Sequence, residues 1–206
     1  SAHVCNHSVW NALVRGWVEH LDVNQFELEI FHTGSHRDEQ TSWASGHVKR
    51  LHADMGSWAH WAKAIANGNF DVLIYPEIGM DAQTARLASL RLAPVQLAAW
   101  GHPITTGLPT IDGFISAQAF EPMDAVTHYT EKLIALPGLG CSYRSFDSPP
   151  VEPDLASLGL EASDRLLLCP GTPFKYGPSD DALLIEIARR CNPCKLVFFR
   201  GQPVEL

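Results

Sequence analysis

Apolar residues recur along this chain at two spacings, one typical of amphipathic helices and the other of buried strands. Between Val9 and Leu21 they return every three or four positions, which predicts a helix, and the segment Phe26–His32 that follows predicts a strand. The polar stretch Thr33–Ser45 shows neither spacing, so a loop is expected there. Another short strand is expected at Val48–His52. The chain thus opens with a helix that leads into a strand.

The same unit of one helix and one strand then repeats. Ser57 is expected to cap a helix that ends at Asn67 before Gly68, and Asp81 to cap a helix over Ala82–Leu92. Apolar runs predict strands at 70–77, 93–100, 111–117 and 132–138, with a helix-like segment at 122–130. Strands without strict polar alternation, separated by single helices, indicate an α/β fold in which a parallel sheet is covered on both faces.

The composition changes after the last of these strands. Pro149, Pro150 and Pro153 lie close together in a loop-like stretch, which predicts a linker between domains. Beyond it, the pattern predicts a strand at 165–171, a helix at 180–191 and a strand at 195–201. We therefore expect a Rossmann-like domain over 1–145 that lacks its first strand, a linker at 146–160, and the start of a second Rossmann-like domain over 161–206. One strand–helix–strand unit cannot bury both faces of its sheet, so the second domain is expected to be truncated.

Composition excludes several classes of function. With 206 residues, of which 46% are hydrophobic and 18% charged, the chain can form a substantial core. A net charge of −8 without a basic stripe argues against a nucleic-acid partner. No apolar run approaches the about 18 residues that a membrane-spanning helix needs, so no membrane partner is expected. Five scattered cysteines fit the reducing cytoplasm better than a disulfide framework.

The strand at 93–100 runs directly into a short loop whose residue types suit a polar ligand. The loop contains Gly101, His102, Pro103, Thr105, Thr106 and Gly107. Glycine lets a phosphate or a sugar approach the backbone, while threonine hydroxyls and an imidazole can bind it by hydrogen bonds. Loops at the carboxyl ends of strands are where open α/β sheets bind ligands. The alternative is an ordinary connection between a strand and a helix.

Three other places carry candidate chemistry. His7, near the start of the first helix, has a pKa range suited to proton transfer or to a hydrogen bond with a sugar hydroxyl, although a surface or capping role is the alternative. Glu77 and Asp81 flank a glycine turn after a strand and could bind hydroxyls, but Asp81 is also a plain helix cap. Thr172 and Lys175 follow the first strand of the second unit, where a lysine could balance a pyrophosphate.

Several common site motifs are missing from the sequence. It contains no GxxxxGK[ST] and no GxGxxG, which removes the main support for a phosphate-loop NTPase or a dinucleotide dehydrogenase. Neither DxD nor HExxH occurs, so no metal site is expected. Cys191 and Cys194 have CxxC spacing, but no second pair or nearby histidine pair accompanies them, and no metal or redox role is assigned to them.

Taken in order, the segments of the chain resemble a known family. The stretches in question are NHSVW, YPEIGMD, LRLAPVQLAAWGHPITTG, IDGFISA, HYTEKLIALPG and LCPGTPFKYGP. They resemble the catalytic region of a bacterial member of the O-linked N-acetylglucosamine transferase (SPINDLY-type) family, and the resemblance covers nearly the whole chain. It implies the glycosyltransferase B architecture of two facing Rossmann-like domains, and an inverting enzyme that uses no metal. It further implies a UDP-sugar as the donor, a protein or peptide as the acceptor, and tetratricopeptide repeats ahead of the catalytic region.

The resemblance also implies roles for individual residues. His7 matches a histidine in the site of the reacting sugar, and the Gly101–Gly107 loop matches the segment that lines the sugar and its phosphates. Lys175 matches a lysine that contacts the pyrophosphate of UDP. Catalytic roles are therefore expected for Lys175 and His7, and substrate-binding roles for the loop together with Glu77 and Thr172.

Departures from the family pattern leave the substrates open. Ile78, Gly79 and Met80 stand where many relatives have a Gly-His-Thr turn, and an amide residue that often precedes the lysine is replaced within Pro170–Pro173. The segments GHPITTG and EIGMD also resemble the bacterial adhesin-modifying enzymes that attach hexose to asparagine. A Ser/Thr transferase of GlcNAc, an asparagine glucosyltransferase, and a non-catalytic binding module that retains the fold all remain open.

Overall fold

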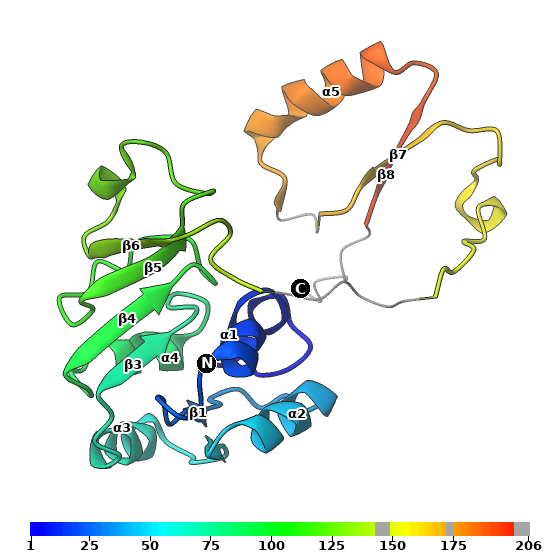
Figure 1. Ribbon diagram of the computed structural model, residues 1–206. Coiled ribbons are helices and arrows are strands. Elements are labelled where there is room, and N and C mark those ends of the chain that lie inside the picture. Colours follow the sequence, from blue (N-terminus) through cyan, green and yellow to red (C-terminus); the bar gives the residue numbers. More distant parts are fainter. Residues whose placement is uncertain (143–148, 172–174, 200–206) are drawn as a thin grey trace. The chain divides into compact units, whose positions relative to one another are not determined.

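The computed structural model describes residues 1–142, 149–171 and 175–199. The chain forms two compact units, Ser1–Phe146 and Asp147–Leu206 (Figure 1). All strand pairs among the described residues are parallel. The predicted α/β fold with parallel strands is therefore confirmed.

The first unit contains a four-stranded sheet and a separate pair of strands. The sheet has the order β3-β4-β5-β6 and consists of β3 (Val72–Tyr75), β4 (Val95–Ala99), β5 (Gly113–Ala117) and β6 (Lys132–Leu136). The pair consists of β1 (Glu29–Phe31) and β2 (Arg50–His52), with Phe31 opposite His52. Ser1 extends this ladder, because its amino group donates to the Phe31 oxygen at 2.9 Å and its oxygen accepts from the Thr33 N–H at 2.8 Å.

The helices of the first unit connect these strands. They are the π-helical turn η1 (Trp10–Val14), α1 (Arg15–His20), α2 (Glu39–His47), α3 (Trp58–Asn67), α4 (Ala82–Ala88) and the 3-10 turn η2 (Ala125–His128). The wide turn η1 continues into α1, and its first carbonyl, at Trp10, accepts from the Arg15 N–H five residues on. Asp81 caps α4 as predicted, by accepting from the Thr84 N–H at 2.8 Å.

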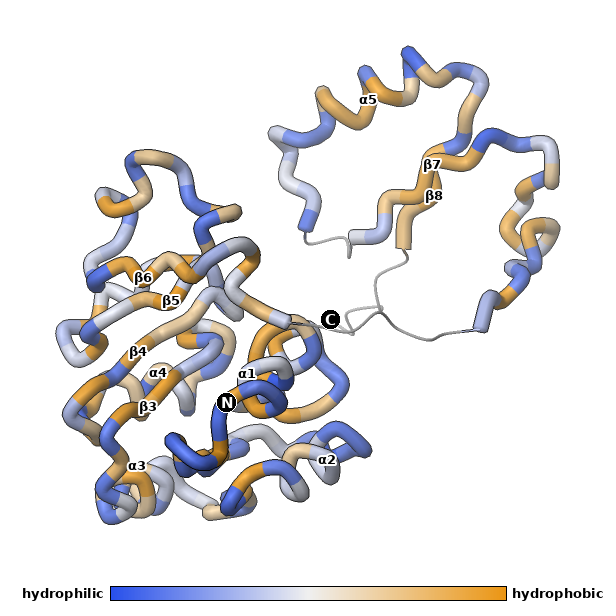
Figure 2. The backbone as a smooth tube through the Cα atoms, in the orientation of Figure 1, coloured by the Kyte–Doolittle hydropathy of each residue, from blue (hydrophilic) through white to orange (hydrophobic). Residues whose placement is uncertain are grey.

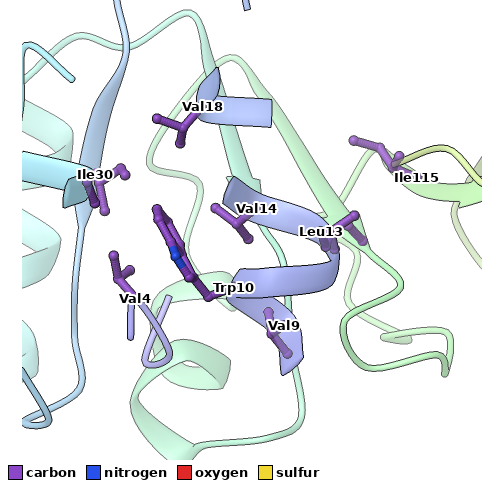
Figure 3. Packing of buried hydrophobic residues seen from close by; sticks show 10 residues of the cluster. Val4, Val9, Trp10, Leu13, Val14, Val18, Ile30 and Ile115 are labelled. Atoms are coloured by element: carbon purple, nitrogen blue, oxygen red, sulfur yellow. The ribbon is translucent and has the colours of Figure 1, made fainter. Parts of the chain in front are cut away.

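Adjacent residues of the central strands belong to two different apolar clusters. Ala99 and Ile115 join the cluster that α1 and η1 form with β1, whose members Figure 3 shows around Trp10. Ala98 and Phe114 join a second cluster with α3 and α4. Because successive side chains of a strand point to opposite faces, β4 and β5 are covered on both sides, and all five residues of β5 are buried. Figure 2 shows the matching concentration of apolar residues along the strands.

The second unit contains the predicted strand–helix–strand arrangement. Its elements are η3 (Ala156–Leu158), β7 (Leu166–Cys169), η5 (Pro178–Asp180), α5 (Asp181–Arg190) and β8 (Lys195–Phe198). The two strands pair in parallel with Leu166 opposite Lys195. The Lys195 ammonium lies 2.6 Å from the Asp164 carboxylate and fixes the start of β8 next to the turn before β7.

The expected loop at 33–45 is wrong, because α2 occupies much of this stretch. The helix lacks an apolar stripe and buries only Thr41 and Ala44, so hydrophobic spacing gave no signal. Its start is defined instead by a capping box, in which the Asp38 carboxylate accepts from the Thr41 N–H while the Thr41 hydroxyl accepts from the Asp38 N–H. Side-chain capping, rather than amphipathic packing, thus specifies this helix.

Two other predicted helices are shorter than expected. The helix predicted over Ala82–Leu92 ends at Ala88. The buried Gln96 side chain donates to the Leu90 carbonyl and accepts from the Leu92 N–H, a donor that a longer helix would use. The segment expected to be helical at 122–130 forms only η2. In both places an irregular connection replaces helical turns.

Candidate functional site

Three segments meet beyond the carboxyl ends of β3 and β4: residues 6–9, 76–81 and 101–107, called here the loop junction. A methyl group on Gly101 would lie 2.4 Å from the Pro76 carbonyl oxygen and 3.1 Å from Val9 Cγ1. One on Gly79 would lie 2.7 Å from His102 Cδ2, and Gly79 has a φ of +106° that favours glycine. The junction therefore brings together the predicted His7, Glu77 and Gly101–Gly107 positions. Parallel α/β sheets bind ligands at this edge.

His7 enters the loop junction as a neutral imidazole. Its ring stacks on that of His3 at a centroid distance of 3.9 Å, and its Nδ1 accepts from the Val9 N–H at 3.2 Å. Burial lowers the pKa of His7, the charge of His3 lowers it further, and the Glu77 carboxylate acts in the opposite direction. Because Nδ1 is the acceptor, the proton of the neutral ring lies on Nε2. In this state His7 can donate a hydrogen bond but cannot accept a proton through Nε2.

The titration of His7 tests this description. We expect the chemical shift of its Cε1 proton to titrate with a midpoint below the ordinary value of 6.5. Glu77→Gln should lower the midpoint further and His3→Gln should raise it, whereas Glu27→Gln, at an exposed position of the same unit, should leave it unchanged. Because folding lowers this pKa, the stability that neutral His7 contributes is present above pH 6.5 and lost as the pH falls through the lowered value. A midpoint at or above 6.5 would contradict the description.

Glu77 is fully buried in the loop junction with one oxygen satisfied. Its Oε1 accepts from the Ala2 N–H at 2.7 Å. Its Oε2 is buried and has no hydrogen-bond partner among the residues that the structure describes. A buried carboxylate oxygen without a partner is costly. Glu77 therefore holds an unpartnered acceptor oxygen inside the junction, enclosed by the protein.

The hydroxyl groups of Thr105 and Thr106 do not have the freedom expected of ligand-binding donors. Both donate to the carboxylate of Glu131, with 2.7 Å between Thr105 Oγ1 and Glu131 Oε2. Pro103 and Gly107 are exposed, and Gly107 has a positive φ of +66°. The two hydroxyl protons are therefore already used by hydrogen bonds within the protein.

Two residues that hold the junction were not identified from the sequence. Glu131 comes directly before β6 and binds a loop 25 residues away, a relation for which the sequence carries no local signal. Asp38 caps α2, and its Oδ2 accepts from the Asn6 N–H at 2.6 Å, next to His7. The Asp-x-x-Thr capping pattern at 38–41 is the signal that could have revealed Asp38.

The remaining predicted positions lie in the second unit. Lys175 is exposed, and the neighbouring Tyr176 is fixed by the Gly171 N–H, which donates to its hydroxyl at 2.9 Å, and by an edge contact with Phe198. Lys175 thus lies next to a tyrosine that is anchored to the end of β7. Thr172 lies outside the described residues.

Two kinds of feature are absent from the described ranges. No three His, Cys, Asp or Glu side chains of these residues gather as a metal site would require. None of the helices over the same residues is both long and apolar enough to cross a membrane.

Comparisons with known proteins identify relatives for part of the chain. No protein-family model matches it. A stretch of 68 residues, 32% of the chain, is 40% identical to the probable UDP-N-acetylglucosamine–peptide N-acetylglucosaminyltransferase SPINDLY of Eustoma exaltatum subsp. russellianum. The protein of the same name from Oryza sativa subsp. japonica is 41% identical over 69 residues. The matched stretch spans 7% of the length of each relative.

A solved structure shows the fold. A mutant of the O-GlcNAc transferase from Thermobaculum terrenum matches with a TM-score of 0.78 at 20% sequence identity. The match covers 96% of this chain and 37% of that one. The chain is therefore similar to SPINDLY over one stretch, and its α/β fold of parallel sheets matches part of a glycosyltransferase B structure.

Proposed function

We propose that the protein transfers a sugar, GlcNAc in the first place, from a UDP-sugar to Ser or Thr of a protein acceptor, with inversion and without a metal or other cofactor. The observation that supports this most directly is the loop junction. It combines a glycine-rich approach to the backbone, a neutral imidazole and an unused buried carboxylate oxygen at the ligand-binding edge of a parallel sheet. The SPINDLY-like stretch supports the choice of UDP-GlcNAc and of a protein acceptor.

The hydrogen-bonding groups of the junction suit the hydroxyls of a sugar. The Nε2–H of His7 donates to a sugar oxygen, and Glu77 Oε2 accepts from a sugar hydroxyl once the residues that cover it move aside. A neighbouring donor and acceptor are what an alcohol group needs, since each hydroxyl can both accept and donate. In this proposal His7 orients the reacting sugar and does not act as the base.

Lys175 has its proposed role at the leaving group. As the bond between the sugar C1 and the β-phosphate oxygen breaks, and the acceptor hydroxyl oxygen bonds to C1 from the opposite side, negative charge develops on UDP. Without a metal, a lysine ammonium and backbone N–H groups stabilise that charge. The acceptor hydroxyl proton is released in the same reaction, so the atoms balance as glycosylated protein, UDP and a proton.

The proposal is tested with the full-length protein that contains this sequence. Calorimetric titration with UDP is expected to show binding, and transfer assays should be run with UDP-GlcNAc and UDP-glucose against Ser/Thr and Asn peptides. Transfer of GlcNAc to Ser/Thr supports the proposal. Transfer of glucose to Asn would instead establish the asparagine glucosyltransferase that the segments GHPITTG and EIGMD resemble. Binding of a protein or peptide without any binding of UDP would establish a non-catalytic module.

The five cysteines are all free thiols, which supports placing the protein in the cytoplasm.

A further inference from the structure

Glu131 connects the Gly101–Gly107 loop to the start of β6. Its side chain is nearly buried, at 7% exposure, and both of its oxygens are engaged by the loop. Oε2 accepts from the Thr105 hydroxyl at 2.7 Å, and Oε1 accepts from the Thr106 N–H at 2.8 Å. The Thr106 hydroxyl also donates to Oε1. One carboxylate therefore binds two successive loop residues through three hydrogen bonds.

The Gly101–Gly107 loop also accepts a hydrogen bond from the segment that contains Glu131. Thr105 Oγ1 accepts from the Thr130 N–H at 3.0 Å, which fixes the residue before Glu131. On the other side, Thr106 Oγ1 accepts from the Leu108 N–H at 3.1 Å. Each threonine oxygen thus both donates and accepts. The result is a closed network that determines the path of the backbone on both sides of Thr106.

Hydrogen bonds from neutral groups stabilise the negative charge of Glu131. Burial raises its pKa, but the hydrogen bonds from Thr106 and Thr105 outweigh burial and keep the pKa below its ordinary value. Its hydrogen-bond partners within the described part of the chain are hydroxyl and amide groups, not cations. Bonds to an ionised acceptor are about twice as strong as neutral ones, so an ionised Glu131 is a firm anchor for the loop.

We propose that Glu131 is a positioning residue for the UDP-sugar: it holds the Gly101–Gly107 loop in the shape that receives the sugar and its phosphates, and it does so by using the hydroxyl protons of Thr105 and Thr106. The assignment rests on the proposed function of the loop junction. It reassigns the two threonines from ligand contacts to members of an internal clamp. The substrate is then recognised by the loop backbone and by His7 and Glu77.

The test compares Glu131→Ala and Glu131→Gln in the full-length protein. Glu131→Ala removes all three contacts in which the carboxylate is the acceptor. The KM of this variant for the UDP-sugar should rise about tenfold or more, as the loss of one to two strong hydrogen bonds predicts. Glutamine keeps one oxygen but places an amide group against a threonine, so a rise of about two- to fivefold is expected. The acceptor KM should not change. Glu27→Gln, an exposed carboxylate of the same unit, is the matched control.

Whether the substitutions change KM or kcat distinguishes a positioning role of Glu131 from a role in stability alone. Loss of stability alone would reduce the fraction of active protein, lowering the apparent kcat while leaving the KM for the UDP-sugar unchanged. Hydrogen exchange gives a readout that does not depend on activity: the Thr106 and Thr130 amides should exchange at least tenfold faster in Glu131→Ala than in the unmodified protein.

The outcomes distinguish this assignment from the proposed function. If the unmodified protein turns over no UDP-sugar, the proposed function fails, and the positioning role fails with it. If the protein is active but the KM for the UDP-sugar stays unchanged in both variants, only the assignment of Glu131 is overturned. Unchanged exchange at Thr106 and Thr130 in the variants would overturn it as well. Should Glu131→Ala fail to fold, Glu131→Gln provides the same comparisons.

Discussion

Lys175→Ala is expected to lower kcat for sugar transfer by about a hundredfold or more, which is the usual loss when one group that stabilises developing negative charge is removed. The reason is that, in the proposed function, Lys175 acts on the leaving UDP, whose charge is greater in the transition state than in the bound substrate. The effect should therefore appear mainly in kcat, with a smaller rise in the KM for the UDP-sugar. Initial rates over a range of UDP-sugar concentrations measure both.

Stability should be unaffected by this substitution. Lys175 is exposed, and substitutions at exposed positions usually change the free energy of unfolding by less than about 0.5 kcal/mol. The matched control is Lys63→Ala, a lysine on the exposed side of α3, which should retain full transfer activity. Equal activity of Lys175→Ala and Lys63→Ala would remove Lys175 from the reaction. A loss of activity in both would point to a general effect of charge.

Trp10→Ala is expected to lower the free energy of unfolding by about 3–5 kcal/mol, the range typical of large aromatic side chains removed from a core. Trp10 is fully buried between Val4, Val14 and Ile30 (Figure 3). Its indole N–H also donates to Gln40 Oε1 at 3.1 Å, so the substitution removes a contact to α2 as well. Chemical unfolding followed by circular dichroism measures the change.

The control for this prediction is a second tryptophan at a helix start. Trp58 is 46% exposed as the first residue of α3, and Trp58→Ala should cost less than about 1 kcal/mol. If the two substitutions had equal effects, Trp10 would not be the central residue of its cluster.

The elements that follow from hydrophobic spacing were predicted well. β4, β5 and α3 lie within their predicted ranges, because each buries an apolar run or stripe against the sheet. α2 was missed because its stability comes from a capping box and from the Thr41 hydroxyl, which donates to the Val4 carbonyl at 2.6 Å. Polar contacts of this kind leave no period in the sequence.

The sequence predicted where the segments of the candidate site lie, but not what each of their residues does. Strand ends placed the 76–81 and 101–107 segments at one edge of the sheet, and the structure brings them together at Gly101 and Pro76. What the threonines do in the loop could not be predicted, because their partner Glu131 is 26 residues from one and 25 from the other and is fixed by the pairing of β5 and β6. The roles of His7, Glu77 and Lys175 in catalysis or binding stay predictions until the kinetic tests are made.

The number of residues in the wide turn η1 determines how the segment before it, which contains His7, is oriented at the loop junction. Each residue of an α-helix turns the chain by about 100°, and η1 accommodates one residue more per turn than an α-helix does. Deleting one residue from Trp10–Val14 would let α1 run on as a regular helix and would rotate the preceding segment by about 100°. His7 would then face away from Glu77. When related chains are aligned, a single-residue gap at this turn therefore bears more on the proposed sugar site than several replacements of one apolar residue by another.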